Sequence, residues 1–395
     1  MLGILFPPRK ESSAIIVDIG NASAGVGLIR MRRGAPSSFS FACRSLTMPD
    51  VRAKGQRVVA VSVSIEKALA AYTAYTASRN IPPPAVLYVF LKAPWSRSQA
   101  AVVTETFPRA QRVTKNHITS LASRALGDDT GIKAPYEALA VRTWINGYPT
   151  GRPIGKTGRS ITIAALKSSA EPAMRDKVTS AILSAFPGRT ILWHSHVRAL
   201  LVYMREQEAH TKDCIIIDIG TEVANIILVR GGILEDDAIL DEGMQTMLRR
   251  ISEHTLPEET LALMRMVERD QCSEEACERI RESLAAYEQD LARTFGEHFA
   301  ARASGMRLPN NLLLVAHPDI VPWLSRFFSR IDFAQFTLTA QPFSVSVLSP
   351  EKLLPWVVGE AGVPVDISLL VSAMSVHSES EAKLKYYAQA VSSKE

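Results

Sequence analysis

The sequence has few cysteines and no long apolar run. Its 395 residues include only four cysteines, Cys43, Cys214, Cys272 and Cys277. The last two are five residues apart, but no nearby histidine or second cysteine pair completes a zinc site, and no disulfide framework is expected. This usage is typical of a reducing, cytosolic compartment. No apolar run reaches the length of a membrane span, so a transmembrane class is not predicted.

Charge of one sign is not in large excess either. Charged residues make up 22% of the chain, and the net charge is +5. This balance would suit an anionic nucleotide or an anionic membrane surface. No motif that reads RNA or DNA is present, and we therefore expect no nucleic-acid partner. The length exceeds one ordinary hydrophobic core and predicts two lobes.

The two ends of the sequence differ from its middle. Residues 1–13 are apolar and then basic, too short and in the wrong charge order for a signal peptide. We interpret them as a flexible leader, with a weak membrane or partner contact as the alternative. Residues 377–395 are predicted to be a polar tail, because their apolar face is too weak for an amphipathic membrane anchor.

Two stretches about 200 residues apart share one design. Ala14–Arg30 and Cys214–Leu234 each contain an apolar run, the triplet Asp-Ile-Gly, a short polar corner and a second apolar run. The pattern predicts two strands joined by a tight turn. In such a turn, backbone N–H groups can face a phosphate, and a carboxylate at the strand end can hold a hydrated Mg²⁺. For either copy alone, a buried hairpin with a capping aspartate is the alternative.

The remaining pattern alternates strands and helices, which predicts an α/β protein. Strands are expected near residues 38–45, 85–91, 139–145, 160–166, 190–193 and 311–316. Helices are expected near 66–78, 115–124, 171–186, 196–208, 244–304, 321–330 and 365–374. These elements give a first lobe (14–81 and 167–209), an inserted strand-helix-strand-strand module (82–166) and a second lobe (210–376) with a helical subdomain at about 244–306. Gly155-Lys156-Thr157 is not a Walker loop, because position 150 is threonine.

Two lobes of strands and helices are expected, and each begins with an Asp-Ile-Gly hairpin. This arrangement resembles the actin, Hsp70 and sugar-kinase superfamily. The resemblance implies an actin-like (ribonuclease H-like) two-lobe fold, in which the two hairpins clamp ATP and Mg²⁺. The implied metal ligands are Asp18 and Asp218. The nucleotide-contacting residues it implies are Asp18, Gly20, Asn21, Ala22, Ser23, Asp218, Gly220, Thr221, Glu222, Ala316 and His317.

The segment WINGYPTGRPIGKTGRSITIAAL, Trp144–Leu166, resembles the inserted subdomain of the FtsA family. The resemblance implies a cytoplasmic protein, peripheral at the inner face of the cell membrane through a partner. It also implies self-association into filaments and binding of the tail of a division-ring protein at the septum. The alternative is a PilM-like adaptor that binds a cytoplasmic peptide of a pilus membrane protein in a pilus or secretion assembly. A sugar kinase is disfavoured, because no further aspartate is placed to act on a substrate hydroxyl.

Three departures weaken the nucleotide chemistry, and one is that the segment after Trp193 has no acidic or amide residue where actin and Hsp70 relatives usually carry one. Thr221 and Glu222 stand where glycines would allow close backbone approach, and Glu222 adds a like charge near phosphate. Ala316-His317-Pro318 replaces the glycines of the adenosine motif. We therefore expect at most a weak ATPase and assign no catalytic residue. His194 and His196 do not share a helix face and are expected to be solvated loop histidines, with a metal or acid–base site as the alternative.

Overall fold

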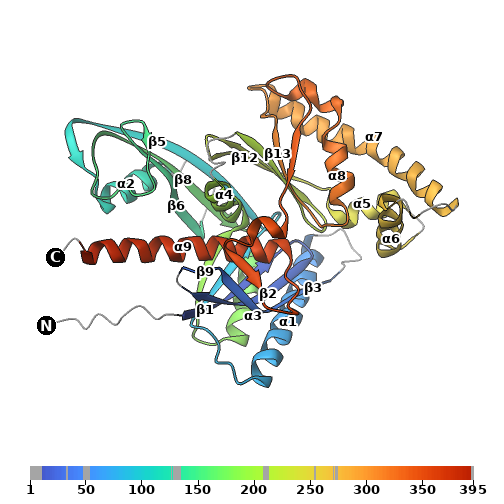
Figure 1. Cartoon of the computed structure of the whole chain (residues 1–395), viewed down its shortest axis with the longest axis horizontal. Helices are drawn as coiled ribbons and strands as arrows, with labels where there is room; N and C mark the ends of the chain where they lie inside the picture. Colours follow the sequence, from blue (N-terminus) through green and yellow to red (C-terminus); the bar gives the residue numbers. More distant parts are fainter. Residues whose placement is uncertain are drawn as a thin grey trace. The chain divides into compact units, whose positions relative to one another are not determined.

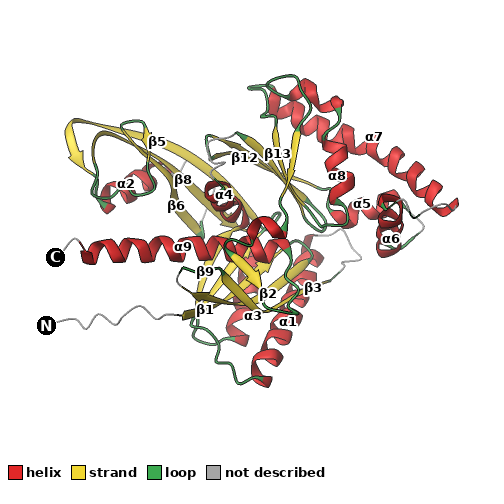
Figure 2. Ribbon diagram, viewed as in Figure 1, coloured by secondary structure: helices red, strands yellow, loops and turns green. Residues whose placement is uncertain are grey.

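A computed structural model describes most of the chain as two compact units. Unit 1 comprises residues 1–96, 170–203 and 350–395, and unit 2 comprises 97–169 and 204–349. The residues described are 11–32, 34–47, 54–125, 127, 135–207, 213–252, 255–269, 271 and 275–392. The first ten residues of the predicted leader and Cys272 lie outside them. Figure 1 traces the chain, and Figure 2 separates its helices from its strands.

Unit 1 contains a six-stranded sheet in the order β15-β3-β2-β1-β4-β9. Its strands are β1 (Glu11–Ile19), β2 (Ser23–Arg32), β3 (Ser37–Leu46), β4 (Val86–Leu91), β9 (Thr190–Ser195) and β15 (Val357–Gly359). The first three form an antiparallel meander, whereas β4 and β9 run parallel to β1. The carboxyl ends of β1, β4 and β9 therefore meet at one edge of the sheet. The predicted first hairpin and the strand at 85–91 are confirmed.

The helices of unit 1 cover both faces of this sheet. They are α1 (Lys54–Ser78), α3 (Pro172–Ala185), α4 (His196–Glu206) and α9 (Ile367–Ser392). Neighbouring residues of β3 show the two faces: the Cys43 thiol donates to the Ala68 carbonyl of α1, while Arg44 reaches Asp366 just before α9. Part of α1, Arg57–Ser78, is long and apolar enough to cross a membrane. It packs against β2, β3 and α3, as expected for a core helix.

The end of the chain belongs to unit 1, which corrects its assignment to the second lobe as far as residue 376. β15 pairs in parallel with β3, and buried residues of α9 such as Leu369 and Met374 pack on this unit. α9 also continues to Ser392, through the region predicted to be a polar tail. The sequence did not signal this return, because β1, β2 and β3, on which α9 packs, lie more than 300 residues away along the chain.

Unit 2 contains a five-stranded sheet in the order β12-β11-β10-β13-β14. Its strands are β10 (Cys214–Ile219), β11 (Ala224–Arg230), β12 (Ile233–Leu240), β13 (Asn311–Val315) and β14 (Ser344–Val347). The packed helices are α5 (Met244–Ile251), α6 (Pro257–Glu268), α7 (Glu275–Ala303) and α8 (Val321–Phe328). Short 3₁₀ segments lie at Ile331–Phe336 in this unit and Pro350–Leu353 in unit 1.

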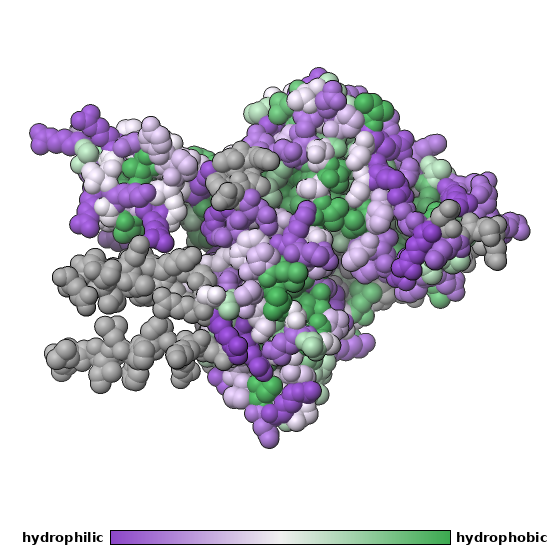
Figure 3. Space-filling model, in the orientation of Figure 1, coloured by the Kyte–Doolittle hydropathy of each residue, from purple (hydrophilic) through white to green (hydrophobic). Residues whose placement is uncertain are grey.

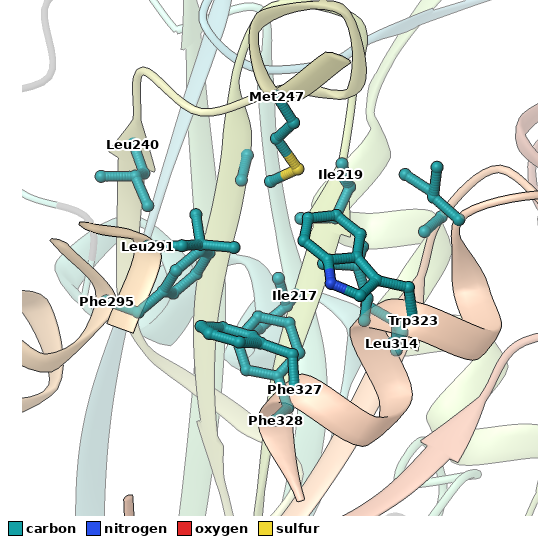
Figure 4. Close-up of a cluster of buried hydrophobic side chains, with 14 of the residues drawn as sticks. Ile217, Ile219, Leu240, Met247, Leu291, Phe295, Leu314, Trp323, Phe327 and Phe328 are labelled. Atoms are coloured by element: carbon teal, nitrogen blue, oxygen red, sulfur yellow. The ribbon is translucent and has the colours of Figure 1, made fainter. Parts of the chain in front are cut away.

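The core of unit 2 lies between its sheet and α7 and α8. Figure 4 shows Phe295, Phe327 and Phe328 gathered beside Ile217 of β10. The rings of Phe295 and Phe328 pack edge to face with their centroids 4.9 Å apart, which is a favourable aromatic arrangement. The predicted second hairpin and helical block are confirmed. Cys277 of α7 takes part in a disulfide bond, which the cysteine spacing did not predict.

The inserted module is a four-stranded sheet with one helix, within unit 2. Its elements are β5 (Ser96–Arg112), α2 (Lys115–Ala125), β6 (Glu137–Ile145), β7 (Tyr148–Pro149) and β8 (Thr157–Ala170), in the sheet order β5-β8-β6-β7. Leu121 of α2 packs with Ile163 and Phe107 of the sheet. Figure 2 shows α2 beside the strands of this module. The predicted module start at residue 82 is therefore wrong: β4 lies in the sheet of unit 1, and β5 begins the module. β5 was missed because polar residues and Pro108 interrupt its apolar pattern.

Candidate functional site

The two Asp-Ile-Gly hairpins have the same turn. The N–H of Gly20 donates to the Ser23 carbonyl at 2.8 Å, and the N–H of Gly220 donates to the Val223 carbonyl at 2.8 Å. Each glycine N–H is therefore used inside its own turn. In the first hairpin, Asn21, Ala22 and Ser23 are also buried.

Arg44 reaches across the first hairpin to its aspartate. The strand register places Asp18 opposite Gly25, and Gly25 opposite Arg44. A side chain at position 25 would collide with Arg44, because its Cβ would lie only 2.8 Å from Arg44 Nη2. The missing side chain leaves a channel across β2, through which the guanidinium reaches β1.

The guanidinium of Arg44 bridges two carboxylates. Its Nη2 donates to Asp18 Oδ2 at 2.6 Å and to Asp366 Oδ1 at 3.0 Å, and its Nε donates to Asp366 Oδ2 at 2.8 Å. Its Nη1 donates to Ser23 Oγ at 3.1 Å. The two bonds to Asp366 form the forked pairing that suits arginine rather than lysine. Asp18 itself is 0% exposed.

Electrostatics keep this bridge ionic. Burial would lower the pKa of Arg44, but the carboxylates of Asp366 and Asp18 outweigh it and raise the pKa above its ordinary value. Burial would raise the pKa of Asp366, but Arg44 outweighs it and lowers that pKa. The bridge is thus charged at neutral pH, and it ties the start of α9 to the first turn.

The surroundings of Asp18 do not fit the Mg²⁺ that the resemblance implies. The guanidinium at 2.6 Å already supplies the positive charge, and it would repel a divalent cation placed beside the same carboxylate. Across the described residues, no group of three or more acidic, histidine or cysteine side chains is arranged to hold a metal ion.

Two buried histidines lie at the same edge of the unit 1 sheet. His196, the first residue of α4, is 3% exposed, with Nδ1 3.9 Å from Asp18 Oδ1. His194 Nδ1 lies 2.6 Å from Arg198 Nη1, and Arg198 Nη2 donates to Glu379 of α9 at 2.6 Å. The prediction of solvated loop histidines is wrong, because β9 runs directly into α4 and contacts with Arg198 and Asp18 enclose both rings.

Two further residues near the first turn were missed by sequence reasoning. Lys92, just after β4, donates from Nζ to Ser368 Oγ at 3.1 Å. Trp95 donates from Nε1 to the Gly20 carbonyl at 2.7 Å. The sequence did contain one signal for Arg44. The hairpin register alone places Gly25 opposite Asp18, and a glycine there leaves room for a long side chain from the next strand. Nothing in the sequence links Arg44 with Asp366, which is 322 positions away.

The second hairpin has a different residue row beside its aspartate. Its register places Asp218 opposite Asn225, and Asn225 opposite Ile239, so no arginine stands in this row. Glu222 turns to α5, where Arg249 Nη2 donates to its two oxygens at 2.8 and 2.7 Å. The negative charge expected beside a phosphate is therefore paired with Arg249.

The start of α5 closes on the second turn. The N–H groups of Met244 and Gln245 donate to the carbonyls of Gly220 and Thr221 at 2.9 and 2.8 Å. Gly243 permits this approach, because a Cβ there would lie 2.4 Å from the backbone of Glu222. The amides that begin α5 are thus bonded to the turn itself.

The predicted adenosine-binding residues lie at the same sheet edge as the second turn. β10 and β13 pair in parallel with Asp218 opposite Val315, which places Ala316 and His317 just beyond the strand end. Ala316 is buried, whereas His317 is exposed and its Nδ1 lies 3.4 Å from Asp319 Oδ2. A hydrogen bond from Arg265 lowers the pKa of Asp319, so its carboxylate is ionised beside His317.

The comparisons with known proteins are structural. No protein-family model matches the chain, and no curated protein matches its sequence. A chain of the PilM–PilN type IV pilus biogenesis complex matches at a TM-score of 0.53 and 15% identity, over 94% of this chain and 99% of that one. The fold is the actin-like ATPase fold.

Two other solved structures are similar at lower scores. Ethanolamine utilization protein EutJ from Carboxydothermus hydrogenoformans matches at a TM-score of 0.43 and 11% identity, over 94% of this chain and 90% of that one. A protein of actin-like ATPase fold and unknown function from Bacteroides thetaiotaomicron matches at 0.36 and 7%, over 89% and 99%. At these identities, the likeness concerns the fold and assigns no function.

Proposed function

We propose that this chain is a PilM-like actin-fold adaptor, which binds a short cytoplasmic segment of a membrane protein. The observation that carries the proposal is the fold match to the PilM–PilN complex over nearly all of both chains. The bridge at Arg44 supports an adaptor over an ATPase, because it occupies the carboxylate that Mg²⁺-ATP would need. We further propose that ATP hydrolysis is weak or absent and that membrane association is indirect in this role.

The inserted module offers a place for such a segment. β5 is 17 residues long and lies at the edge of its sheet, so one side of its backbone faces no other strand of that sheet. Val102 on this strand is 53% exposed. An unprotected edge of this length invites another chain, and extended peptides bind such edges by adding a strand.

Peptide titration tests the proposal. Fluorescent peptides from the cytoplasmic ends of membrane proteins of the same organism would be titrated with the full chain, and we expect saturable binding of at least one. Thr104→Pro and Glu105→Pro serve as a pair, because adjacent N–H groups of a strand point to opposite sides. The proline at the open side should weaken binding about tenfold or more with the fold retained. Equal binding by both folded variants, or no bound peptide, would count against the proposal.

A second candidate is an FtsA-like division adaptor that self-associates into filaments at the septum. The segment Trp144–Leu166 favours it through its resemblance to the FtsA insertion. Sedimentation with and without the tail of the tubulin-like division protein separates the candidates. Filaments that pellet with that tail would support the division role, whereas a soluble protein that binds only membrane-protein peptides would support the PilM-like role.

A further inference from the structure

The positive charge of the chain is concentrated in the inserted module. Residues 97–169 hold eleven lysines and arginines but four aspartates and glutamates, a net charge of +7, whereas the whole chain carries +5. The rest of the protein is thus slightly acidic. No acidic residue occurs from 106 to 127 or from 138 to 170. The module therefore has an electrostatic character of its own.

Within the module, exposed cations gather where two connections meet. The N–H of Val113 donates to the Lys156 carbonyl at 2.8 Å, and the N–H of Gly155 donates to the Val113 carbonyl at 2.8 Å. These bonds join the end of β5 and the start of α2 to the loop between β7 and β8. We call this region the basic tip, defined by its exposed cations Arg109, Arg112, Lys115, Lys156 and Arg159.

In the part of the chain that the structure describes, no carboxylate neutralises the basic tip. None of the five forms an ion pair with a carboxylate among the described residues, whereas Arg124 further along α2 pairs with Glu105. The start of β8, which carries Arg159, is held in place, because the Arg159 and Ser160 N–H groups donate to Asn146 Oδ1 at 2.7 and 3.1 Å. The positive charge is therefore presented on an ordered surface.

Two apolar side chains stand among these charges. Tyr148 is 77% exposed and Ile154 is 44% exposed, and both belong to the segment between β6 and β8, which also carries Lys156. Figure 3 shows small hydrophobic patches on a largely hydrophilic surface at the module. An aromatic ring and an aliphatic chain beside basic residues suit the boundary between lipid headgroups and acyl chains. An acidic protein would use the cations, but it would leave both apolar groups without a role.

We propose that the basic tip binds the surface of an anionic membrane, with the cations on lipid phosphates and with Tyr148 and Ile154 inserted at the headgroup level. This contact is independent of the peptide binding proposed above, because it uses exposed side chains at the module end and not the backbone edge of β5. It would give the protein a direct membrane contact that adds to any membrane protein it binds.

Vesicle co-sedimentation of the full chain tests this inference. The vesicles are phosphatidylcholine alone or phosphatidylcholine mixed with phosphatidylglycerol. We expect binding only to the anionic vesicles, weakening as salt rises. Arg112→Glu with Lys156→Glu should bind at least about tenfold more weakly. The matched control, Lys67→Glu with Arg279→Glu, makes the same charge change at exposed residues elsewhere and should keep the wild-type affinity.

Two further measurements distinguish a membrane from other anionic partners. Tyr148→Ser with Ile154→Ser should weaken vesicle binding without removing its salt dependence, and the added emission of Tyr148→Trp should shift to the blue on anionic vesicles. Equal loss in the matched control, or no binding to anionic vesicles, would overturn the proposal. Binding of a polyglutamate peptide without vesicle binding would also overturn it and would assign the basic tip to an acidic protein.

Discussion

At the scale of single residues, the arginine that bridges Asp18 and Asp366 takes the place of a metal. It satisfies a fully buried carboxylate, and it joins a strand near the start of the chain to the helix at its end. Removing one partner of a buried ion pair costs more stability than replacing both partners by apolar residues, because the remaining charge stays buried without a partner. The stability of unit 1 should therefore depend strongly on Arg44.

Arg44→Met tests this dependence. The variant keeps an unbranched apolar stem but leaves Asp18 buried without its counter-charge, so we expect a loss of roughly 3 kcal/mol in the free energy of unfolding. Urea denaturation followed by circular dichroism measures it. Arg279→Met, at an exposed arginine with no ion pair to any residue that the structure describes, should change that free energy by less than about 0.5 kcal/mol. Equal midpoints for both variants would show that the bridge contributes little.

Asp237 of β12 makes a pH-dependent contribution to the stability of unit 2. It accepts a hydrogen bond from the Ser98 N–H at 2.7 Å, and burial raises its pKa to about 6. Because the folded pKa lies above the unfolded value of about 3.9, folding is favoured most below that value and loses this contribution as pH rises through 6. Asp237→Asn should remove that loss.

The expected result is a variant more stable than wild type at pH 7, by roughly 1–3 kcal/mol, with no difference at pH 4. Urea denaturation across this pH range measures the effect. A variant that is less stable at every pH would mean that the ionised carboxylate has a partner stronger than the Ser98 amide.

At the scale of elements, the second hairpin depends on its contact with α5. Gly243→Ala places a methyl group 2.4 Å from the backbone of Glu222, so the start of α5 must move away from the turn. We expect a loss of about 1–3 kcal/mol in the free energy of unfolding, measured by thermal or urea denaturation. Gly296→Ala in the middle of α7 is the control, because its Cβ meets nothing within 4 Å. It should stabilise by about 0.5–1 kcal/mol, since alanine favours the helix. A tolerated Gly243→Ala would show that the contact is not tight.

Local patterns predicted the elements better than their assembly. The hairpins at Asp18 and Asp218 were predictable because an apolar run, a turn and a second run lie within about 20 residues. β5 was missed because its side chains alternate between solvent and α2 with few apolar residues. The place of β4 was missed because a strand's sheet partners depend on the whole fold, and a proline run before it looked like a boundary.

The candidate site shows the same limit. The residues of the first turn were located from sequence, and the structure places them as a hairpin. Their neighbours Asp366 and Ser368 were not, because no periodicity connects residues that meet only when α9 packs on the sheet. The burial of His194 and His196 was also missed. Their spacing was judged as if both lay on one helix, whereas His194 lies in β9 and His196 begins α4.

At the scale of the whole molecule, the fold class and the first hairpin differ in what they imply about nucleotide binding. The fold is the one named for actin-like ATPases, whereas the first hairpin of unit 1 holds an arginine at its carboxylate. In the second hairpin, the register places Asn225, and not a glycine, opposite Asp218. An adaptor needs the shape of the fold and its inserted module, and it does not need turnover of nucleotide.

The central claim is that Arg44 replaces Mg²⁺ at Asp18, so that the intact protein does not bind Mg²⁺-ATP through this residue. Isothermal titration of ATP into the full chain, with and without Mg²⁺, tests it most directly, with Asp18→Asn run alongside. We predict no saturable binding that requires Mg²⁺ and the same result for both proteins. Saturable, Mg²⁺-dependent binding by the wild type that is lost in folded Asp18→Asn would contradict the claim.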